Sequence, residues 1–208
     1  MYDIMYIYSG LWYNTTSINA NFKPNGGAMD YKHKHRMPHV MRHMITAMVT
    51  ALGGTCSRRQ TGCVLTRDGK VVATGYVGVP SGLEHCIEKD GGCFLTDGHC
   101  KDTIHGEENA CLQCQGTADT AYCTDEPCIN CLKSLLGKGV KEIYFWRGYA
   151  DPIRDSFVQR NKLEGIFCTF TGYEYESLNK LWLTLQLQLI EYSELLDQSK
   201  EYADDIQP

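Results

Sequence analysis

The sequence predicts an α/β layer fold in one main domain, and three observations support this. At 208 residues the chain is long enough for one domain with a sizeable core and short for two. Two strand-like runs at 61–66 and 71–76 flank Arg67-Asp68-Gly69-Lys70, which is typical of a β-hairpin. From residue 121 strand-like and helix-like runs alternate, which indicates parallel strands covered by helices.

The remaining elements follow from apolar spacing and from turn residues. Pro38 suits a first helical turn, apolar residues recur at helical spacing from Val40 to Leu52, and Gly53-Gly54 ends that helix. A loop rich in cysteine and glycine occupies 78–104. We expect helices at 105–115, 127–136 and 152–162, and strands at 121–124, 140–146 and 166–170.

The two ends of the chain differ from this middle part. Residues 1–28 are rich in Asn, Ser, Thr and Gly without a period, so we predict a poorly ordered extension, with Met29 as an alternative start. In 173–208, apolar residues at a 3.5-residue spacing predict a long amphipathic helix that packs on the domain or on another subunit. The segment LWLTLQLQLI also alternates with period two, which leaves a strand as the alternative.

Composition narrows the class of protein. The net charge of −5 and the lack of a basic central stretch argue against a broad nucleic-acid groove and favour a small-molecule substrate. No run of about 18 apolar residues is present, so a membrane span is not expected. The start MYDIMYIYSGLWY lacks the features of a signal peptide, so we expect the eleven cysteines to be thiols or metal ligands in the cytoplasm.

Two half-motifs predict a catalytic zinc site: His105-Gly106-Glu107 and Pro127-Cys128-Ile129-Asn130-Cys131. His105, Cys128 and Cys131 fill three corners of a tetrahedral site and leave the fourth open. Glu107 lies close enough to move protons. A closed structural zinc site is the alternative, but it would need a second Cys-x-x-Cys or a His-x-x-x-His and has no use for a carboxylate. Each half-motif starts a predicted helix, whose positive end favours thiolate.

Other His and Cys residues have simpler interpretations. His39 and His43 lie one helical turn apart and could bind metal, but no third ligand accompanies them, so a solvated cationic helix start is favoured. Cys111, Cys114 and Cys123 are expected to be core thiols.

From about Cys56 to Phe170 the chain resembles the deoxycytidylate (dCMP) deaminases of the cytidine deaminase superfamily. The resemblance is carried by CSRRQTG, GYVGVPSGLEHC, HGEENA and CTDEPCINCLKSLLGKGVKEIYF. It implies a cytidine deaminase-like three-layer fold, a mixed central sheet flanked by helices, with residues 29–172 as the zinc-dependent deaminase domain. It also implies hydrolysis of dCMP to dUMP and ammonia, which feeds thymidylate synthesis. Family members are often hexamers regulated by dCTP and dTTP, so the resemblance implies a homo-oligomer.

The resemblance also assigns roles to matching residues. His105, Cys128 and Cys131 would hold the catalytic zinc, and Glu107 would carry protons to N3 of the pyrimidine and to the departing amine. Tyr149 matches an aromatic residue that lines the nucleotide site, with packing at the rim as the alternative. A second, structural zinc would bind Cys56, Cys86 and Cys100, with Cys93 or His99 as the fourth ligand.

Two positions depart from the family pattern. Val77 stands where the family usually has an asparagine, and Gly106 stands where it usually has an alanine. A missing methyl group beside the base leads us to expect a pocket that prefers a C5-modified or otherwise altered cytosine nucleotide.

Two other functions stay open. One is an editing deaminase that acts on tRNA or single-stranded DNA; the acidic balance argues against it and the basic segment from Lys32 to Arg42 argues for it. The other is a catalytically silent, zinc-stabilised interaction protein, against which the intact Glu107 argues.

Overall fold

A computed structural model describes the backbone of residues 37–204 and the side chains of residues 37–195. All of the described residues belong to one compact unit, which begins at Met37. The predicted extension at 1–28 lies outside the described residues. No helix in the described part has both the length and the apolar character needed to span a bilayer.

The centre of the domain is a five-stranded mixed sheet in the order β2-β1-β5-β6-β7. β1 pairs antiparallel with β2 and β5, whereas β5–β6 and β6–β7 are parallel. The strands are β1 (Gly62–Arg67), β2 (Lys70–Tyr76), β5 (Thr120–Asp125), β6 (Glu142–Arg147) and β7 (Phe167–Thr169). The predicted hairpin and the predicted parallel half are therefore both confirmed, within one sheet.

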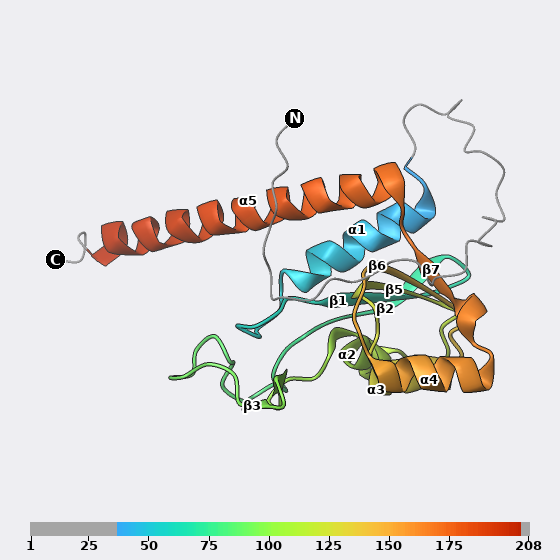
Figure 1. The fold of residues 1–208 in the computed structure, drawn as a ribbon. Coiled ribbons are helices and arrows are strands. Elements are labelled where there is room, and N and C mark those ends of the chain that lie inside the picture. Colours follow the sequence, from blue (N-terminus) through green and yellow to red (C-terminus); the bar gives the residue numbers. More distant parts are fainter. Residues whose placement is uncertain (1–36, 205–208) are drawn as a thin grey trace, which may run out of the picture. The chain divides into compact units, whose positions relative to one another are not determined.

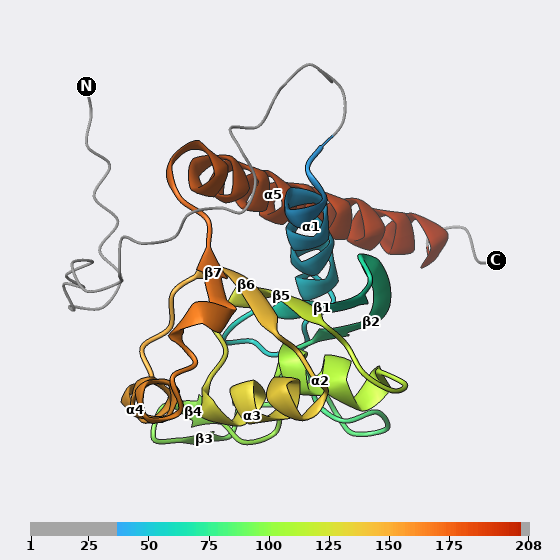
Figure 2. The same ribbon diagram turned by 90° about the vertical axis from the view of Figure 1, so that its right-hand side faces the viewer.

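Helices cover both faces of this sheet, which gives three layers (Figures 1 and 2). One face carries α1 (His39–Ala51) and α5 (Gly172–Asp204), packed through Met44, Met48 and Leu178. The other carries α2 (Gly106–Gln113), α3 (Ile129–Gly137) and α4 (Pro152–Asn161), packed through residues that include Leu132, Leu135 and Ile143. These three layers, with a mixed central sheet flanked by helices, agree with the arrangement that the family resemblance implies.

Local sequence explains where several elements begin and end. Asp68 and Gly69 both have positive φ (51° and 71°), as a two-residue hairpin turn requires, so the β1–β2 connection is short. The Asp151 side chain accepts hydrogen bonds from the first amides of α4, and Pro152 occupies its first turn. Lys162 then ends α4 in the left-handed conformation.

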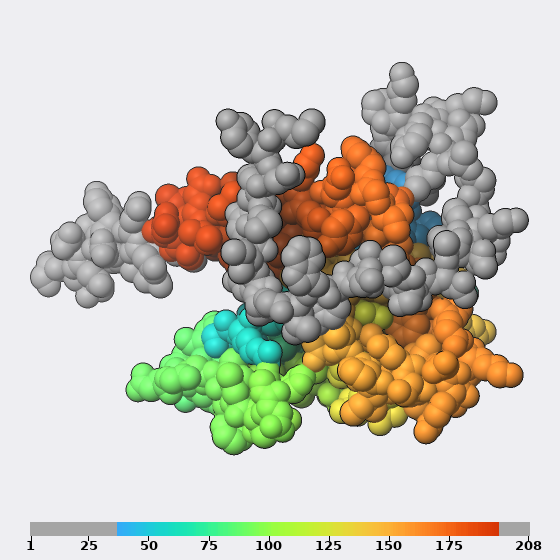
Figure 3. Space-filling model, viewed as in Figure 1, coloured from blue at the N-terminus to red at the C-terminus, as the bar shows by residue number. Residues whose placement is uncertain are grey.

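The long loop after β2 contains a small hairpin that the sequence pattern did not predict. Its strands are β3 (Leu95–Thr96) and β4 (His99–Cys100), and a bridge between Gly78 and Ile104 closes the base of the loop. In the space-filling view the loop forms the green lobe at the lower edge of the molecule (Figure 3). A 3-10 turn (Glu164–Ile166) precedes β7.

The C-terminal segment is a helix, and the alternative of a strand is wrong. The side chain of Leu178 is fully buried against the sheet, and the Trp182 ring meets Trp146 edge-on at 5.7 Å. With 33 residues, α5 is about 50 Å long. Its opposite side exposes Leu183, Leu187 and Ile190.

Candidate active site

The three predicted zinc ligands converge from the starts of two helices. His105 is the N-cap residue of α2, Cys128 is the N-cap residue of α3, and Cys131 lies in the first turn of α3. The His105 Nδ1 atom is 3.6 Å from the Cys128 Sγ atom and 3.4 Å from the Cys131 Sγ atom. Adjacent N and S ligands of a tetrahedral zinc lie about 3.5 Å apart, as follows from bonds of about 2.0 and 2.3 Å. The side chains therefore fit a zinc ion without rearrangement.

The charge state of these ligands also suits a cation. The hydrogen bond from Cys131 lowers the pKa of the Cys128 thiol to about 4, and His105 adds to this effect. The Cys128 thiolate in turn raises the pKa of His105. Cys131, beside that thiolate and buried, has its pKa raised. A thiolate is thus already favoured at Cys128, and zinc would displace the remaining proton of the group.

Glu107 lies beside the ligands but is not one of them. It is buried in the first turn of α2, and its Oε2 atom is 3.5 Å from the Cys131 Sγ atom. Burial raises the pKa of Glu107 to about 7. A carboxyl group with a pKa near neutrality can both accept and donate a proton, which is what a general acid–base must do.

A second group of thiols lies nearby. The sulfur atoms of Cys56, Cys86, Cys93 and Cys100 all lie within 4.8 Å of one another. The Cys56–Cys93 distance is 3.4 Å and the Cys86–Cys100 distance is 3.7 Å, close to the roughly 3.8 Å between sulfur ligands of a tetrahedral zinc. None of the eleven cysteines is in a disulfide. The structure therefore brings Cys93, rather than His99, to the fourth position.

Burial and hydrogen bonds set the protonation of these thiols. Burial raises the pKa of Cys86 to about 12 and also raises the pKa of Cys56. Burial would raise the pKa of Cys93 too, but hydrogen bonds from Ser57 and from the neighbouring thiols lower it to about 7. Four buried or half-buried thiols without a disulfide form a closed donor set, typical of a structural zinc.

Both groups of candidate metal ligands border one cleft beyond the carboxyl ends of the parallel strands β5 and β6, where α/β proteins commonly bind small molecules. The cleft is lined by Cys56, Arg58, Arg59, Thr61, Val77, His99, Cys100, Thr103, His105, Glu107, Asp125, Glu126, Cys128 and Tyr149.

The structure places two of the three predicted substrate residues in this cleft. Val77 and Tyr149 line it, but Gly106 does not. A Cβ atom on Gly106 would lie 3.2–3.3 Å from backbone atoms of Gly75, Thr61 and Gly62. The missing methyl group therefore faces the backbone of residues 61, 62 and 75 rather than the cleft, which argues against the expectation that Gly106 enlarges the space beside the base.

The sequence patterns did not reveal a set of charged residues around the cleft. Asp125 and Arg147 are register partners on β5 and β6, and each ends its strand. Arg59 and Glu126 also line the cleft, and Glu126 pairs with the buried Arg154 at 3.2 Å. The sequence did contain a signal for this pair. Asp125 lies just before Pro127-Cys128 and Arg147 ends the next parallel strand, so both residues must lie at the same edge of the sheet.

The remaining predicted His and Cys residues have structural roles. Cys111, Cys114 and Cys123 are buried core thiols, as predicted. His39 is exposed, whereas His43 is buried against Tyr122, with ring centroids 4.9 Å apart. His43 is therefore a core residue rather than part of a solvated helix start, and the two histidines do not form a metal-binding group among the described residues.

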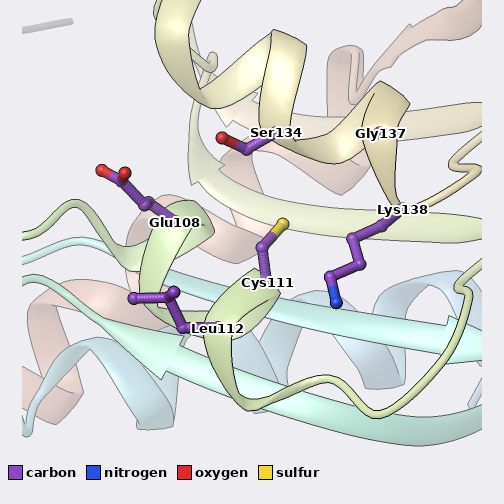
Figure 4. A pocket seen from close by; sticks show the side chains of 6 residues that line it. All are labelled: Glu108, Cys111, Leu112, Ser134, Gly137 and Lys138. Carbon is purple, nitrogen blue, oxygen red and sulfur yellow. The ribbon is translucent and has the colours of Figure 1, made fainter.

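A larger hollow, about 320 Å³, lies between α2 and α3 (Figure 4). It is lined by Glu108, Cys111, Leu112, Ser134, Gly137 and Lys138. The Lys138 ammonium donates to the carbonyl of Cys114, and the hollow contains none of the ligands described above. Size alone therefore does not mark the active site.

Ligands presented from two helix starts, at one edge of a mixed sheet, define the class of cytidine deaminase-like α/β proteins. The family model of the cytidine and deoxycytidylate deaminase zinc-binding region matches residues 35–147. The chain belongs to this family, which confirms the resemblance seen in its sequence.

Individual relatives agree with this assignment. ComE operon protein 2 of Bacillus subtilis is 41% identical over 104 residues, which is 48% of this chain and 54% of that protein. The deoxycytidylate deaminase of Saccharomyces cerevisiae is 33% identical over 111 residues, 49% of this chain and 35% of that enzyme. The chain thus spans about half or less of the length of these curated relatives.

A solved structure matches the domain along its own full length. The dCMP deaminase from the cyanophage S-TIM5, in complex with dCMP and dUMP, is 27% identical with a TM-score of 0.53. The match covers 65% of this chain and 100% of that one.

Proposed function

We propose that the protein is a zinc-dependent deaminase that converts dCMP to dUMP and ammonia and so supplies the precursor for thymidylate synthesis. The observation that carries this proposal is the convergence of His105, Cys128 and Cys131 beside a buried Glu107 whose pKa is raised to about 7. The names of the yeast and cyanophage relatives support the choice of dCMP.

The reaction replaces the C4 amine of cytosine with oxygen from water and releases ammonia. Zinc, when bound, supplies a Lewis acid that makes water acidic enough to act as a nucleophile near neutral pH. Glu107 takes up a proton from water and passes it to ring N3. It then takes the proton of the hydroxyl group that has been added at C4 and passes it to the departing amine, so that the C4 carbonyl forms as ammonia leaves. Because the pKa of Glu107 is near 7, neither the uptake nor the release of this proton is strongly uphill.

The second thiol group has a structural role in this proposal. Cys56, Cys86, Cys93 and Cys100 would hold a zinc ion that orders the long loop, because they join the segment before β1 to three points of that loop. Since Cys56 and Cys100 also line the cleft, this ion would fix part of the substrate site.

Base selectivity would depend on Val77, because Gly106 faces away from the cleft. Val77 is only 6% exposed and presents an apolar side chain where the family usually has an amide. A 5-methyl group on the base is compatible with such a wall, so 5-methyl-dCMP belongs beside dCMP in any substrate panel.

The decisive variant is Glu107→Gln, which keeps the size of the side chain and removes its ability to carry a proton. We expect ammonia release from dCMP to fall by roughly 10²–10⁴-fold, with unchanged zinc content and unfolding temperature. The matched control is Glu108→Gln, the exposed neighbour on α2, which should retain activity.

The panel for the zinc-loaded protein is cytidine, dCMP, dCTP, 5-methyl-dCMP and a cytosine-containing single-stranded oligonucleotide. Turnover confined to the oligonucleotide, or full activity of Glu107→Gln, would overturn the proposal. So would a complete lack of ammonia from every compound in the panel.

A further inference from the structure

A buried carboxylate at the edge of the cleft is clamped between two arginines. The Asp125 side chain is 7% exposed, and each of its oxygens contacts both guanidinium groups. Arg59 approaches at 2.8 and 3.2 Å, and Arg147 approaches at 2.8 and 3.0 Å. We call these three residues the Asp125 clamp.

The clamp carries one more positive than negative charge. Two guanidinium groups face a single carboxylate, and an arginine has five N–H donors. Arg59 uses its Nε and one Nη2 hydrogen on Asp125, which leaves three donors that Asp125 does not engage. The side chain of Arg59 is 45% exposed, so these donors are accessible from the cleft that Arg59 lines.

The second arginine is enclosed rather than exposed to the cleft. Arg147 lies over the rings of Trp146 and Trp182, at 4.7 and 5.4 Å, and donates to the carbonyl of Gln60. It does not line the cleft. The two arginines therefore have different roles: Arg147 supports Asp125 from behind, and Arg59 faces the ligand space.

Helix α5 braces this support. Trp182 lies on Arg147, and the Gln186 amide donates to the Gln60 side chain at 2.8 Å, next to Arg59 in the sequence. Trp146 is held by a hydrogen bond to Asn179 of the same helix. The position of Arg59 is thus set by contacts that run from α5 to the cleft.

Tyr149 connects the clamp to the zinc ligands. The Arg59 guanidinium lies over the Tyr149 ring at 5.8 Å. Burial, followed by the charge of Cys128, raises the pKa of Tyr149, whereas Arg59 and Arg58 act to lower it. Tyr149 is therefore close enough to both Arg59 and Cys128 to be affected by their charges. Arg59 faces the same cleft as the candidate zinc ligands.

We propose that Arg59 binds the 5′-phosphate of the substrate nucleotide and that Asp125 is the positioning residue that holds Arg59 for this contact, supported by Arg147 and α5. This inference rests on the proposed function, because the phosphate is the only anionic group of dCMP. Planar guanidinium donors match phosphate oxygens. An arginine already fixed by Asp125 loses little conformational entropy on binding.

A purely structural ion pair would give different results. Its loss would lower stability and affect substrates with and without a phosphate alike. A positioned phosphate contact makes the loss specific to the phosphorylated ligand. The quantity to measure is therefore the effect of each substitution on the phosphorylated ligand divided by its effect on the ligand without a phosphate.

The experiment uses the zinc-loaded full chain and the variants Arg59→Gln and Asp125→Asn. KM and kcat are measured with dCMP and with deoxycytidine, and the binding of dUMP and of deoxyuridine is measured by calorimetry. We expect Arg59→Gln to raise KM for dCMP and Kd for dUMP by roughly tenfold or more. We expect kcat, KM for deoxycytidine and Kd for deoxyuridine to change little. Asp125→Asn should show the same phosphate-specific change, because its two arginines are no longer held together.

Controls separate this inference from its alternatives. Arg160→Gln removes an exposed charge of α4 outside the cleft and should have no effect. If Arg58→Gln causes the phosphate-specific loss and Arg59→Gln does not, the inference is overturned, and the same holds if Arg59→Gln weakens both ligands equally. Because nucleotide binding is read without turnover, an inactive wild-type protein would count against the proposed function alone.

Discussion

His43 is a buried residue whose ionisation should affect stability. It is 4% exposed, its Nε2 atom has no hydrogen-bond partner, and its ring lies on Tyr122. Burial, the neighbouring Arg42 and His39 lower its pKa from 6.5, against a raising contribution from the Gly69 backbone. Protonation of His43 is therefore less favourable in the folded protein than in the unfolded chain.

We predict that this histidine makes the protein less stable in mild acid. With the folded pKa below the unfolded one, its contribution is complete above pH 6.5 and is lost as the pH falls below that value. In His43→Phe, the free energy of unfolding measured with urea should fall less between pH 7.5 and pH 5.5 than in the wild type. The exposed His99→Gln, which is far from α1 in the sequence, is the control; an equal change in both variants would contradict the prediction.

Gly75 sets how closely α2 approaches the sheet. A Cβ atom at this position would overlap the backbone nitrogen of Ala110 and the carbonyl oxygen of Gly106. Gly75→Ala must therefore push α2, which carries His105 and Glu107, away from β2. We predict a loss of about 1–3 kcal/mol in the free energy of unfolding, together with reduced activity.

The matched control for this change is Gly137→Ala in α3. A Cβ atom there meets no atom within 4 Å, so alanine should leave stability unchanged or raise it slightly. Both variants are compared by urea unfolding and by ammonia release. A Gly75→Ala protein as stable as the wild type would show that the strand and the helix can separate without cost.

At the scale of single residues, the sequence predicted a group of candidate zinc ligands that the structure brings together, but it did not predict the orientation of Gly106. His105, Cys128 and Cys131 are recognisable because their spacing and the helix starts are local properties. The direction of a Cβ atom at 106 depends on which strands pack against α2, and this contact joins residues 30 or more positions apart. Asp125 and Arg59 were missed for the same reason.

At the scale of elements, the loop at 78–104 is the least regular part of the domain. Its sequence predicted no strand, although Thr96-Asp97-Gly98-His99 repeats the Asp-Gly pattern of the β1–β2 turn. Asp97 and Gly98 have positive φ (50° and 74°), so β3 and β4 form a second hairpin of the same kind. The four-thiol group brings Cys100 of this hairpin close to Cys56 in the segment before β1.

We predict that Cys93→Ala reduces the zinc content from two ions to one per chain. The catalytic ligands are untouched, so the remaining ion should stay at His105, Cys128 and Cys131. The loop should become easier to cleave by protease, and KM for dCMP should rise, because Cys56 and Cys100 also line the cleft.

His99→Ala is the control for this prediction, since His99 lines the cleft outside the thiol group. It should keep two zinc ions per chain, measured by elemental analysis after dialysis. If His99→Ala loses an ion and Cys93→Ala does not, the fourth ligand is His99.

At the scale of the whole domain, the layer fold could be predicted because each strand and helix is marked by its own sequence. The alternation after residue 121 indicates parallel strands, and the Asp-Gly turn indicates an antiparallel pair; together they give the mixed sheet. The way in which α5 covers the sheet was harder to predict from the sequence. Its apolar residues occupy more than one side of the helix, so periodicity alone does not say which side meets the sheet.

The order of these parts along the chain affects how the protein is made. Every residue of both ligand groups lies between Cys56 and Cys131, whereas α5 begins at Gly172. Synthesis proceeds from the N-terminus, so both ligand sets leave the ribosome before the helix that covers the sheet. A zinc ion would therefore meet its candidate ligands in a nascent chain in which α1 alone covers this face of the sheet. The contacts of Trp182 with Arg147 and of Gln186 with Gln60 can form only after all of the candidate metal ligands have been synthesised.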